Sequence, residues 1–231
     1  MSEIKFILFD CMETIVDVLK LPDVRMYSAF AYHGSGYEDL WNDFDSFVSD
    51  FARVKSEMEK ARQKYEEYNL FDRFRLMVNQ KLTDENQIEK AVDAISANYW
   101  KNYKANCYVA DDVKAALADL HSKFKCGIVS NFMVVGGIEE LLEIHGIDKY
   151  FDFVVTSVNI GWRKPCKEIY DATLALARVP KEQILFVGDD YVCDYVGTTS
   201  YGFNAVLLDK ENVNKNADRK VQSIKELLEI I

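Results

Sequence analysis

Five short apolar runs are the feature that most limits how this chain can fold. Each run is rich in Val, Ile, Leu and Phe and shows little alternation between apolar and polar residues. The runs are Ile4–Phe9, Lys125–Ser130, Phe151–Ser157, Gln183–Gly188 and Asn204–Leu208. Strands that are covered on both faces have this pattern. Helical patterns lie between the runs, near 111–123, 135–145, 167–178 and 191–201, and a final one lies at 223–230. This alternation predicts an α/β fold in which helices cover both faces of a parallel sheet.

The stretch from residue 16 to residue 106 differs, because it holds no convincing strand. Apolar residues recur at steps of three and four over 44–68, which predicts one long amphipathic helix. A second stripe at 88–99 follows a helix start at Thr83 or Asp84. Aromatic residues at helical spacing are typical of core packing, so we do not interpret them as a ligand site. The predicted domains are an α/β domain of residues 1–15 and 107–231, and a helical domain of residues 16–106.

Charge and composition limit the partners of the protein. The 231 residues carry 28 Lys and Arg against 38 Asp and Glu, a formal net charge of −10. We therefore expect neither nucleic acid nor a membrane as a partner, whereas a small anionic substrate is compatible with a few local cations and a metal ion. No apolar run approaches membrane length, and the five cysteines form no CxxC pair. A cytoplasmic protein is expected, and the sequence carries no signal of its oligomeric state.

Polar side chains that can do chemistry follow the predicted strands at the points where the strands end. In chain order they are Asp10, Ser130, Asn131, Lys164, Asp189, Asp190 and Asp194. Taken singly, each has an ordinary explanation as a turn or helix-capping residue. The carboxyl ends of parallel strands meet at one edge of a sheet, however, and ligands of such sheets bind there. The sequence therefore predicts a single site that gathers carboxylates, a hydroxyl group and an ammonium group.

Four segments carry a resemblance to a known family. They are ILFDCMET at 7–14, GIVSN at 127–131, GWRKPCKEIY at 161–170 and FVGDDYVCDYVGT at 186–198. Their order and spacing resemble the haloacid dehalogenase superfamily, whose members are mostly phosphatases. The resemblance covers the whole chain. It implies a Rossmann-like three-layer α/β/α core with a helical cap inserted after the first motif.

The resemblance also implies a role for each residue of the site. Asp10 would be the nucleophile that forms an aspartyl phosphate, and Lys164 would assist it. The groups that would bind the phosphoryl oxygens are Ser130, Asn131 and Lys164, although Asn131 also suits bracing of the loops. The expected Mg²⁺ ligands are Asp10, the main-chain carbonyl of Met12, Asp189 and Asp194, with Thr14 and Asp190 as supporting residues.

The first motif departs from the family pattern at Met12. Phosphatases of the family carry a second aspartate at this position, which protonates the leaving group and then activates water. A thioether exchanges no protons, and loss of such a group typically costs about 10²–10⁴ in rate. Glu13 is a candidate replacement, but neighbouring side chains of an extended segment point in opposite directions.

Four functions are compatible with these residues. The favoured one is a Mg²⁺-dependent hydrolase of a small phosphorylated metabolite. A 2-haloacid dehalogenase-like activity is an alternative, although members of that branch have serine where this chain has Asp189. A phosphonatase-like activity would need a cap lysine, for which Lys55, Lys60 and Lys64 are candidates. The fourth is a binding protein that keeps the fold without catalysis.

Overall fold

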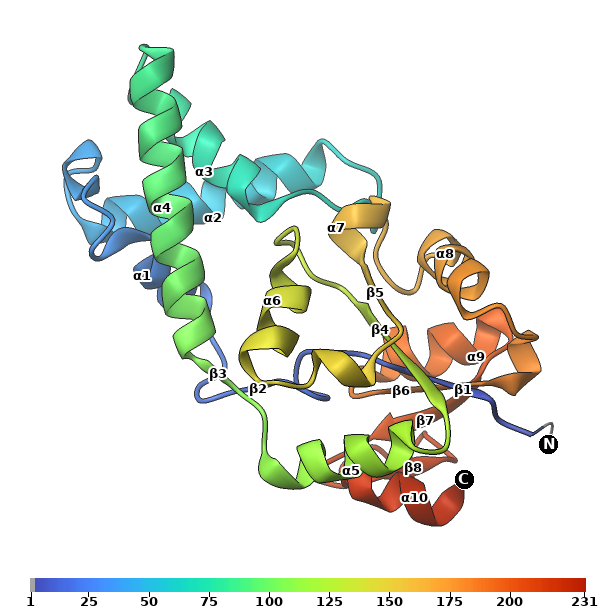
Figure 1. Ribbon diagram of the computed structural model, residues 1–231. Coiled ribbons are helices and arrows are strands. Elements are labelled where there is room, and N and C mark those ends of the chain that lie inside the picture. The colour runs from blue at the N-terminus through green and yellow to red at the C-terminus, as the bar shows by residue number, and fades with distance from the viewer. Residues whose placement is uncertain (1–2) are drawn as a thin grey trace. The chain divides into compact units, whose positions relative to one another are not determined.

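The chain divides into two compact units that are linked by two short strands. A computed structural model describes residues 3–231 (Figure 1). One unit consists of Met1–Asp17 with Tyr108–Ile231, and the other of Val18–Cys107. The linking strands β2 (Asp17–Val18) and β3 (Cys107–Tyr108) pair in a two-stranded sheet. Strand β2 therefore lies in a stretch where the sequence predicted no strand, because two residues are too few to produce a recognisable pattern.

The first unit is built on a six-stranded parallel sheet. Its strands are β1 (Phe6–Phe9), β4 (Lys125–Ser130), β5 (Phe153–Thr156), β6 (Ile184–Gly188), β7 (Asn204–Leu208) and β8 (Lys220–Val221). Their spatial order is β5-β4-β1-β6-β7-β8, and all neighbouring pairs are parallel. The predicted α/β class with a parallel sheet is confirmed, while β8 was missed because it too has only two residues.

Strand β1 lies at the point where the direction of winding reverses. The chain builds the sheet outward through β4 and β5 on one side of β1, and through β6 to β8 on the other. Phe9 at the end of β1 is in register with Ile128 of β4 and Val187 of β6. Open parallel sheets bind ligands beyond the carboxyl ends of the strands at such a reversal. The residues after β1, β4 and β6 are therefore placed around one crevice.

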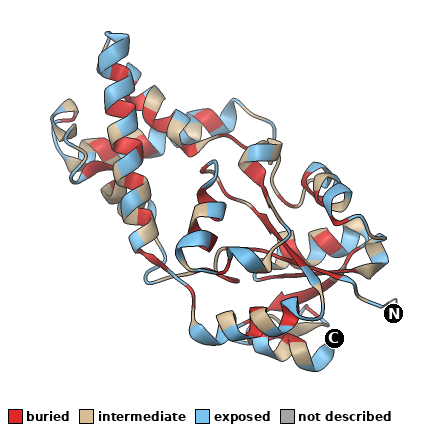
Figure 2. Cartoon of the chain, in the orientation of Figure 1, coloured by how far each residue is buried: buried red, intermediate tan, exposed pale blue. Residues whose placement is uncertain are grey.

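Both faces of β1 are buried by the layers around it. Phe6 and Leu8 pack in a core with Ile169 and Tyr170 of α8 (Lys167–Ala177). Ile7 and Phe9 point to the opposite face and are fully buried as well. Figure 2 shows the central strands buried along their length, with exposed residues on the outer sides of the helices. The other helices of this unit are α5 (Asp111–His121), α6 (Gly137–Ile144), α7 (Ser157–Ile160), the π-helix η4 (Tyr191–Val196), α9 (Gly197–Tyr201) and α10 (Leu227–Ile230), with 3-10 turns η2 (Asp148–Tyr150), η3 (Lys181–Gln183) and η5 (Ile224–Glu226).

The second unit is helical. Its elements are α1 (Val24–Tyr32), η1 (Glu38–Leu40), α2 (Phe44–Lys60), α3 (Leu70–Asn79) and α4 (Glu85–Ala105). The prediction of one helix continuing to Tyr68 is wrong. Helix α2 ends at Lys60, and Tyr65 has a left-handed backbone with φ of 70°. Helix α4 starts as predicted at Asp84, whose carboxylate accepts a hydrogen bond from the Gln87 N–H. Within residues 3–231, no helix has both the length and the apolar composition to cross a bilayer.

Candidate active site

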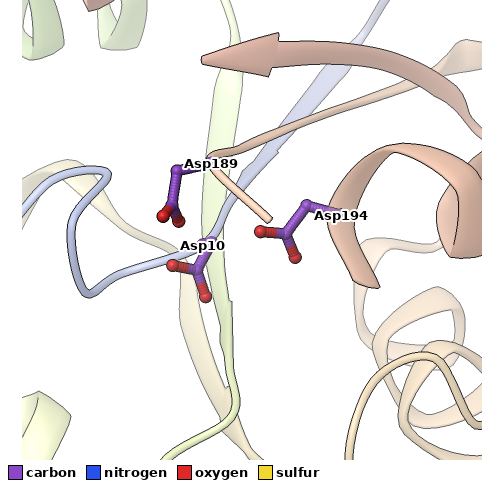
Figure 3. A group of neighbouring side chains, drawn as sticks. All are labelled: Asp10, Asp189 and Asp194. Atoms are coloured by element: carbon purple, nitrogen blue, oxygen red, sulfur yellow. The ribbon is translucent and has the colours of Figure 1, made fainter. Parts of the chain in front are cut away.

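Three aspartates of the first unit converge beyond the ends of β1 and β6. Asp10 follows β1 directly, and its N–H donates to Val187 O (2.8 Å), so the chain is still held against β6 at this point. Asp189 follows Gly188, the last residue of β6, and Asp194 lies on η4. Figure 3 shows their carboxyl groups gathered around one space. One oxygen atom from each lies within 4.8 Å of the other two.

The return of the chain to Asp194 depends on a cap and on a glycine. The Asp190 carboxylate accepts hydrogen bonds from the N–H groups of Val192 and Cys193, both at 2.8 Å, and so begins η4. Asp194 in turn accepts a hydrogen bond from the Asp190 N–H (3.1 Å). A Cβ atom on Gly188 would lie 2.6 Å from the Cβ of Asp194. Glycine at this position therefore allows the close approach of Asp194 to the end of β6.

The Lys164 ammonium lies in the interior between two of these carboxylates. Its Nζ donates to Asp10 Oδ1 (2.6 Å) and to Val129 O (2.8 Å), and it lies 2.7 Å from Asp194 Oδ1. The side chain is only 2% exposed. Burial alone would lower the pKa of this ammonium, but Asp10 and Asp194 more than offset that effect and hold the pKa above its usual value. Lys164 is therefore charged, and three acceptors surround its three N–H groups.

The carboxylates hold protons more tightly than ordinary aspartates do. Burial raises the pKa of Asp10, and the negative charge of Asp189 adds to the effect while Lys164 opposes it. Burial also raises the pKa of Asp194, with Lys164 opposing and Asp10 contributing. The Asp189 side chain is exposed, yet the surrounding protein atoms and the charge of Asp194 raise its pKa to about 6. The positive charge of Lys164 therefore offsets only part of the negative charge of the three carboxylates.

A cavity of about 180 Å³ joins these groups. It is lined by Asp10, Met12, Ser130, Asn131, Arg163, Lys164, Asp189, Asp190, Cys193 and Asp194. The structure thus brings together every residue that the sequence analysis proposed for the site except Thr14, which is not part of the cavity lining. Thr14 is buried and donates a hydrogen bond from Oγ1 to Asp189 Oδ1 (3.2 Å). The supporting role of Thr14 stays a prediction.

Two cavity residues, Arg163 and Cys193, were given no role by the sequence analysis. Both lie inside the segments that carried the resemblance, next to Lys164 and Asp194, and this adjacency was the one available signal. Asp190 lines the cavity, but its side chain caps η4, and among residues 3–231 it is not part of the carboxylate cluster. Its contacts are those of a helix cap.

Met12, and not Glu13, faces the cavity. Among the residues described, Met12 is part of the lining and Glu13 is not. The backbone of Glu13 is left-handed, with φ of 58°, and its N–H donates to Val16 O (2.8 Å). Among the described residues, the turn thus places Met12, and not Glu13, at the cavity that Asp10 also lines.

The cluster has the composition of a site for a hard divalent cation. Three carboxylates against one ammonium leave a formal excess of two negative charges, and all the ligand atoms are oxygens. Mg²⁺ and Ca²⁺ prefer such oxygen ligands, whereas zinc and copper favour nitrogen and sulfur. Asp10, Asp189 and Asp194 would hold the ion, and its positive charge would offset both the burial of the three carboxylates and the repulsion between them.

Comparisons with known proteins agree with the geometry. Residues 4–197 match the family of haloacid dehalogenase-like hydrolases. The haloacid dehalogenase-like hydrolase domain-containing protein 3 of Xenopus laevis is 40% identical over 84 residues, which are 36% of this chain and 34% of the relative. A glyceraldehyde 3-phosphate phosphatase of Methanothermobacter thermautotrophicus is 32% identical over 105 residues, 45% of this chain and 46% of the relative. The matches therefore span less than half of the length of either relative.

The fold also has solved counterparts. The crystal structure of a 2-haloacid dehalogenase from Pseudomonas syringae pv. Tomato DC3000 superposes with a TM-score of 0.81, covering 98% of this chain and 97% of the other. The two sequences are only 17% identical. This likeness concerns the fold alone.

Proposed function

Because the chain belongs to the family of haloacid dehalogenase-like hydrolases, we propose that it is a Mg²⁺-dependent hydrolase of a small phosphorylated metabolite, acting through Asp10. The observation that carries the proposal is the placement of the Asp10 carboxylate at 2.6 Å from the buried Lys164 ammonium, inside the cluster with Asp189 and Asp194. Phosphatases among the relatives support the choice of a phosphate substrate.

Asp10 would act as the nucleophile. One of its oxygens attacks phosphorus, the bond between phosphorus and the leaving-group oxygen breaks, and that oxygen departs with the electron pair. Water then attacks the aspartyl phosphate, which releases inorganic phosphate and restores the carboxylate. Lys164 opposes the effect of burial on the pKa of Asp10 and fixes the orientation of its carboxylate through the hydrogen bond to Oδ1. Ser130, at the end of β4, supplies a hydroxyl group to the phosphoryl oxygens.

The metal supplies positive charge that offsets the repulsion between the carboxylates and an incoming phosphate. The residues that would hold it are Asp10, Asp189, Asp194 and the main-chain carbonyl of Met12. Thr14 orients Asp189 through its hydrogen bond, and such partners of ligands matter because they fix the ligand geometry.

Met12 determines which phosphates would react. Met12 lines the cavity where a proton donor would be useful, and its thioether has no proton to give. Substrates whose leaving group departs without protonation, such as acyl and aryl phosphates, are therefore expected to react faster than alkyl phosphates. An acid supplied by the substrate would serve the same purpose.

Turnover of acetyl phosphate and of a sugar phosphate, each with Mg²⁺ and with excess EDTA, tests the proposal. We expect hydrolysis of acetyl phosphate that needs Mg²⁺ and is abolished by Asp10→Asn. Met12→Asp should increase turnover of the sugar phosphate by up to about 10²–10⁴. Full activity in Asp10→Asn would refute the nucleophile, and no gain in Met12→Asp would refute the leaving-group argument.

The absence of a proton donor at Met12 also favours a second candidate, a binding protein for phosphorylated ligands. Mg²⁺-dependent binding of a phosphate mimic, without turnover of any substrate in a broad panel, would support it. Release of chloride from 2-chloropropionate in excess EDTA would instead support the dehalogenase-like alternative. The cluster argues against that alternative, because three carboxylates would repel an anionic haloacid unless a metal ion were present.

A further inference from the structure

We infer that Asn131 is a positioning residue, which holds the peptide of Lys164 and thereby keeps the ammonium between Asp10 and Asp194. The Lys164 N–H donates to Asn131 Oδ1 (2.7 Å), and Asn131 Nδ2 donates to Lys164 O (3.2 Å). One side chain thus satisfies both main-chain polar groups of one residue. The catalytic consequence rests on the proposed function, whereas the placement of the ammonium does not.

Lys164 needs such a partner because of its position in the chain. It lies in the turn between α7 and α8, outside the helices and strands of the described residues, and its side chain is buried. Buried main-chain N–H and C=O groups without partners cost free energy comparable to a lost hydrogen bond. Asn131 follows directly after β4 and so is fixed by the sheet. The amide therefore ties the Lys164 turn to the rigid edge of the sheet.

Asparagine suits this role because its amide carries both an acceptor and donors. Aspartate would keep the acceptor and lose the donor, and leucine of similar size would lose both. Both polar atoms of the Asn131 side chain, Oδ1 and Nδ2, contact the main chain of Lys164. We infer an action of Asn131 through Lys164, and direct contact of its amide with the phosphoryl group stays a separate prediction.

Cys193 makes a weaker contact with the same peptide and offers a matched control. Its thiol donates to Lys164 O at 3.5 Å, while its own carbonyl accepts a hydrogen bond from the Tyr170 hydroxyl (2.7 Å). Asn131 and Cys193 thus both donate to the Lys164 carbonyl, whereas among the described residues the Lys164 N–H donates to the Asn131 side chain. Removing the thiol leaves one donor in place, whereas removing the Asn131 amide leaves the N–H without its acceptor.

The first test measures the ammonium itself and needs no turnover. In lysine-labelled protein, the NH₃⁺ resonance of Lys164 is assigned as the one that disappears in Lys164→Met, and its exchange with water is measured by NMR. Burial and three acceptors predict slow exchange in the wild type. We expect exchange to accelerate about tenfold or more in Asn131→Leu, because the turn opens more easily. Cys193→Ala should remain within about twofold of the wild type.

The second test separates positioning from substrate contact. In Asn131→Leu, kcat for acetyl phosphate should fall about 10- to 100-fold, the range found for groups that hold a functional residue in place. KM and the Ki of inorganic phosphate should change by less than about twofold if the amide acts only through the Lys164 peptide. Asn131→Asp, which keeps the acceptor for the Lys164 N–H, should fall between the wild type and Asn131→Leu.

The outcomes are distinct. Unchanged ammonium exchange in both Asn131 variants overturns the inference, and so does a large rise in the Ki of phosphate with unchanged kcat. If Asn131→Leu fails to fold, the same measurements on Asn131→Asp decide. If the wild type hydrolyses no phosphate at all, the proposed function fails while the exchange measurement still decides the role of Asn131.

Discussion

Mg²⁺ should stabilise the protein against heat in a way that depends on pH. A ligand present at 100 times its Kd adds about 2.7 kcal/mol to the free energy of unfolding. For a chain of this size, 1 kcal/mol corresponds to about 2–4 °C in Tm, so a shift of about 5–10 °C is expected at pH 8. At pH 5, the Asp189 carboxyl group with its pKa of about 6 is mostly protonated. Mg²⁺ must then displace that proton, which lowers its affinity by about tenfold per pH unit below the pKa.

The raised pKa values of Asp10 and Asp194 lower the affinity further in the same direction. In the metal-free protein, the contribution of the site to the free energy of unfolding should instead be larger at pH 5 than at pH 8. Its folded state binds more protons than its unfolded state, because the folded pKa values lie above the unfolded value of 3.8. The contribution of these protonated groups to the free energy of unfolding is therefore complete below pH 3.8, and it is lost as pH rises through about 6. Without Mg²⁺ the site contributes least at pH 8, where Mg²⁺ contributes most.

The assay is thermal unfolding followed by circular dichroism at pH 5 and pH 8, with Mg²⁺ or with EDTA. Asp189→Asn removes the exposed ligand and should remove most of the Mg²⁺-dependent shift at pH 8. Asp119→Asn, a change at an exposed position of α5, is the matched control and should leave the shift intact. Equal shifts at the two pH values, or a full shift in Asp189→Asn, would refute the assignment of the cluster as the metal site.

Three further results are expected. Lys164→Met should lower the free energy of unfolding by about 3–5 kcal/mol in urea at pH 8, because two buried carboxylates lose their partner, and by less at pH 5, where they take up protons; equal losses at both pH values would contradict this. Gly188→Ala should cost about 1–3 kcal/mol by forcing Asp194 away from the end of β6, and it should also abolish the Mg²⁺-dependent rise in Tm. Burial raises the pKa of the Cys193 thiol to about 12, so iodoacetamide at pH 8 should label it at least about a hundredfold more slowly in the native protein than in urea, as measured by mass spectrometry. Labelling at equal rates would show that the thiol is not shielded.

The sheet was predictable because a strand covered on both faces leaves a strong signal in the sequence. The apolar runs Lys125–Ser130 and Asn204–Leu208 coincide with β4 and β7. The strands β2 and β8 have two residues each, and so short a segment has no periodicity to detect. Sequence patterns therefore identify those strands that are both buried and longer than two residues.

The end of α2 shows why a helix boundary can escape such patterns. No glycine or proline interrupts the apolar stripe after Lys60. In the structure, an Arg62 guanidinium N–H donates to Met58 O near the end of the helix, and the same guanidinium lies 4.7 Å from the centre of the Tyr68 ring. Side chains that bond the last carbonyl groups can end a helix without any breaking residue. Such contacts depend on the folded turn and leave no mark on hydrophobic spacing.

The sequence predicted which residues lie at the candidate site, but not which contacts they make there. Residues at strand ends had to meet, because parallel strands in register end at one edge. The contacts of Asn131 with the Lys164 peptide, and of Asp190 with the start of η4, depend on the conformation of two turns. The roles assigned to these residues by resemblance stay predictions until variants are measured.

The electrostatics of the cluster and the chemistry at Met12 are separable, and this separation decides how the function can be established. The carboxylates and the Lys164 ammonium make their contacts without the Met12 side chain. Metal binding and phosphate binding should therefore not depend on a proton donor at position 12. Binding measurements alone therefore give the same result for an enzyme and for a binding protein. The rate as a function of leaving-group pKa does not, since an enzyme that lacks a general acid must lose rate steeply as the leaving group becomes more basic. Met12→Asp should flatten that dependence only if Asp10 is a working nucleophile. A new general acid cannot accelerate hydrolysis in a binding protein that does not attack the phosphate.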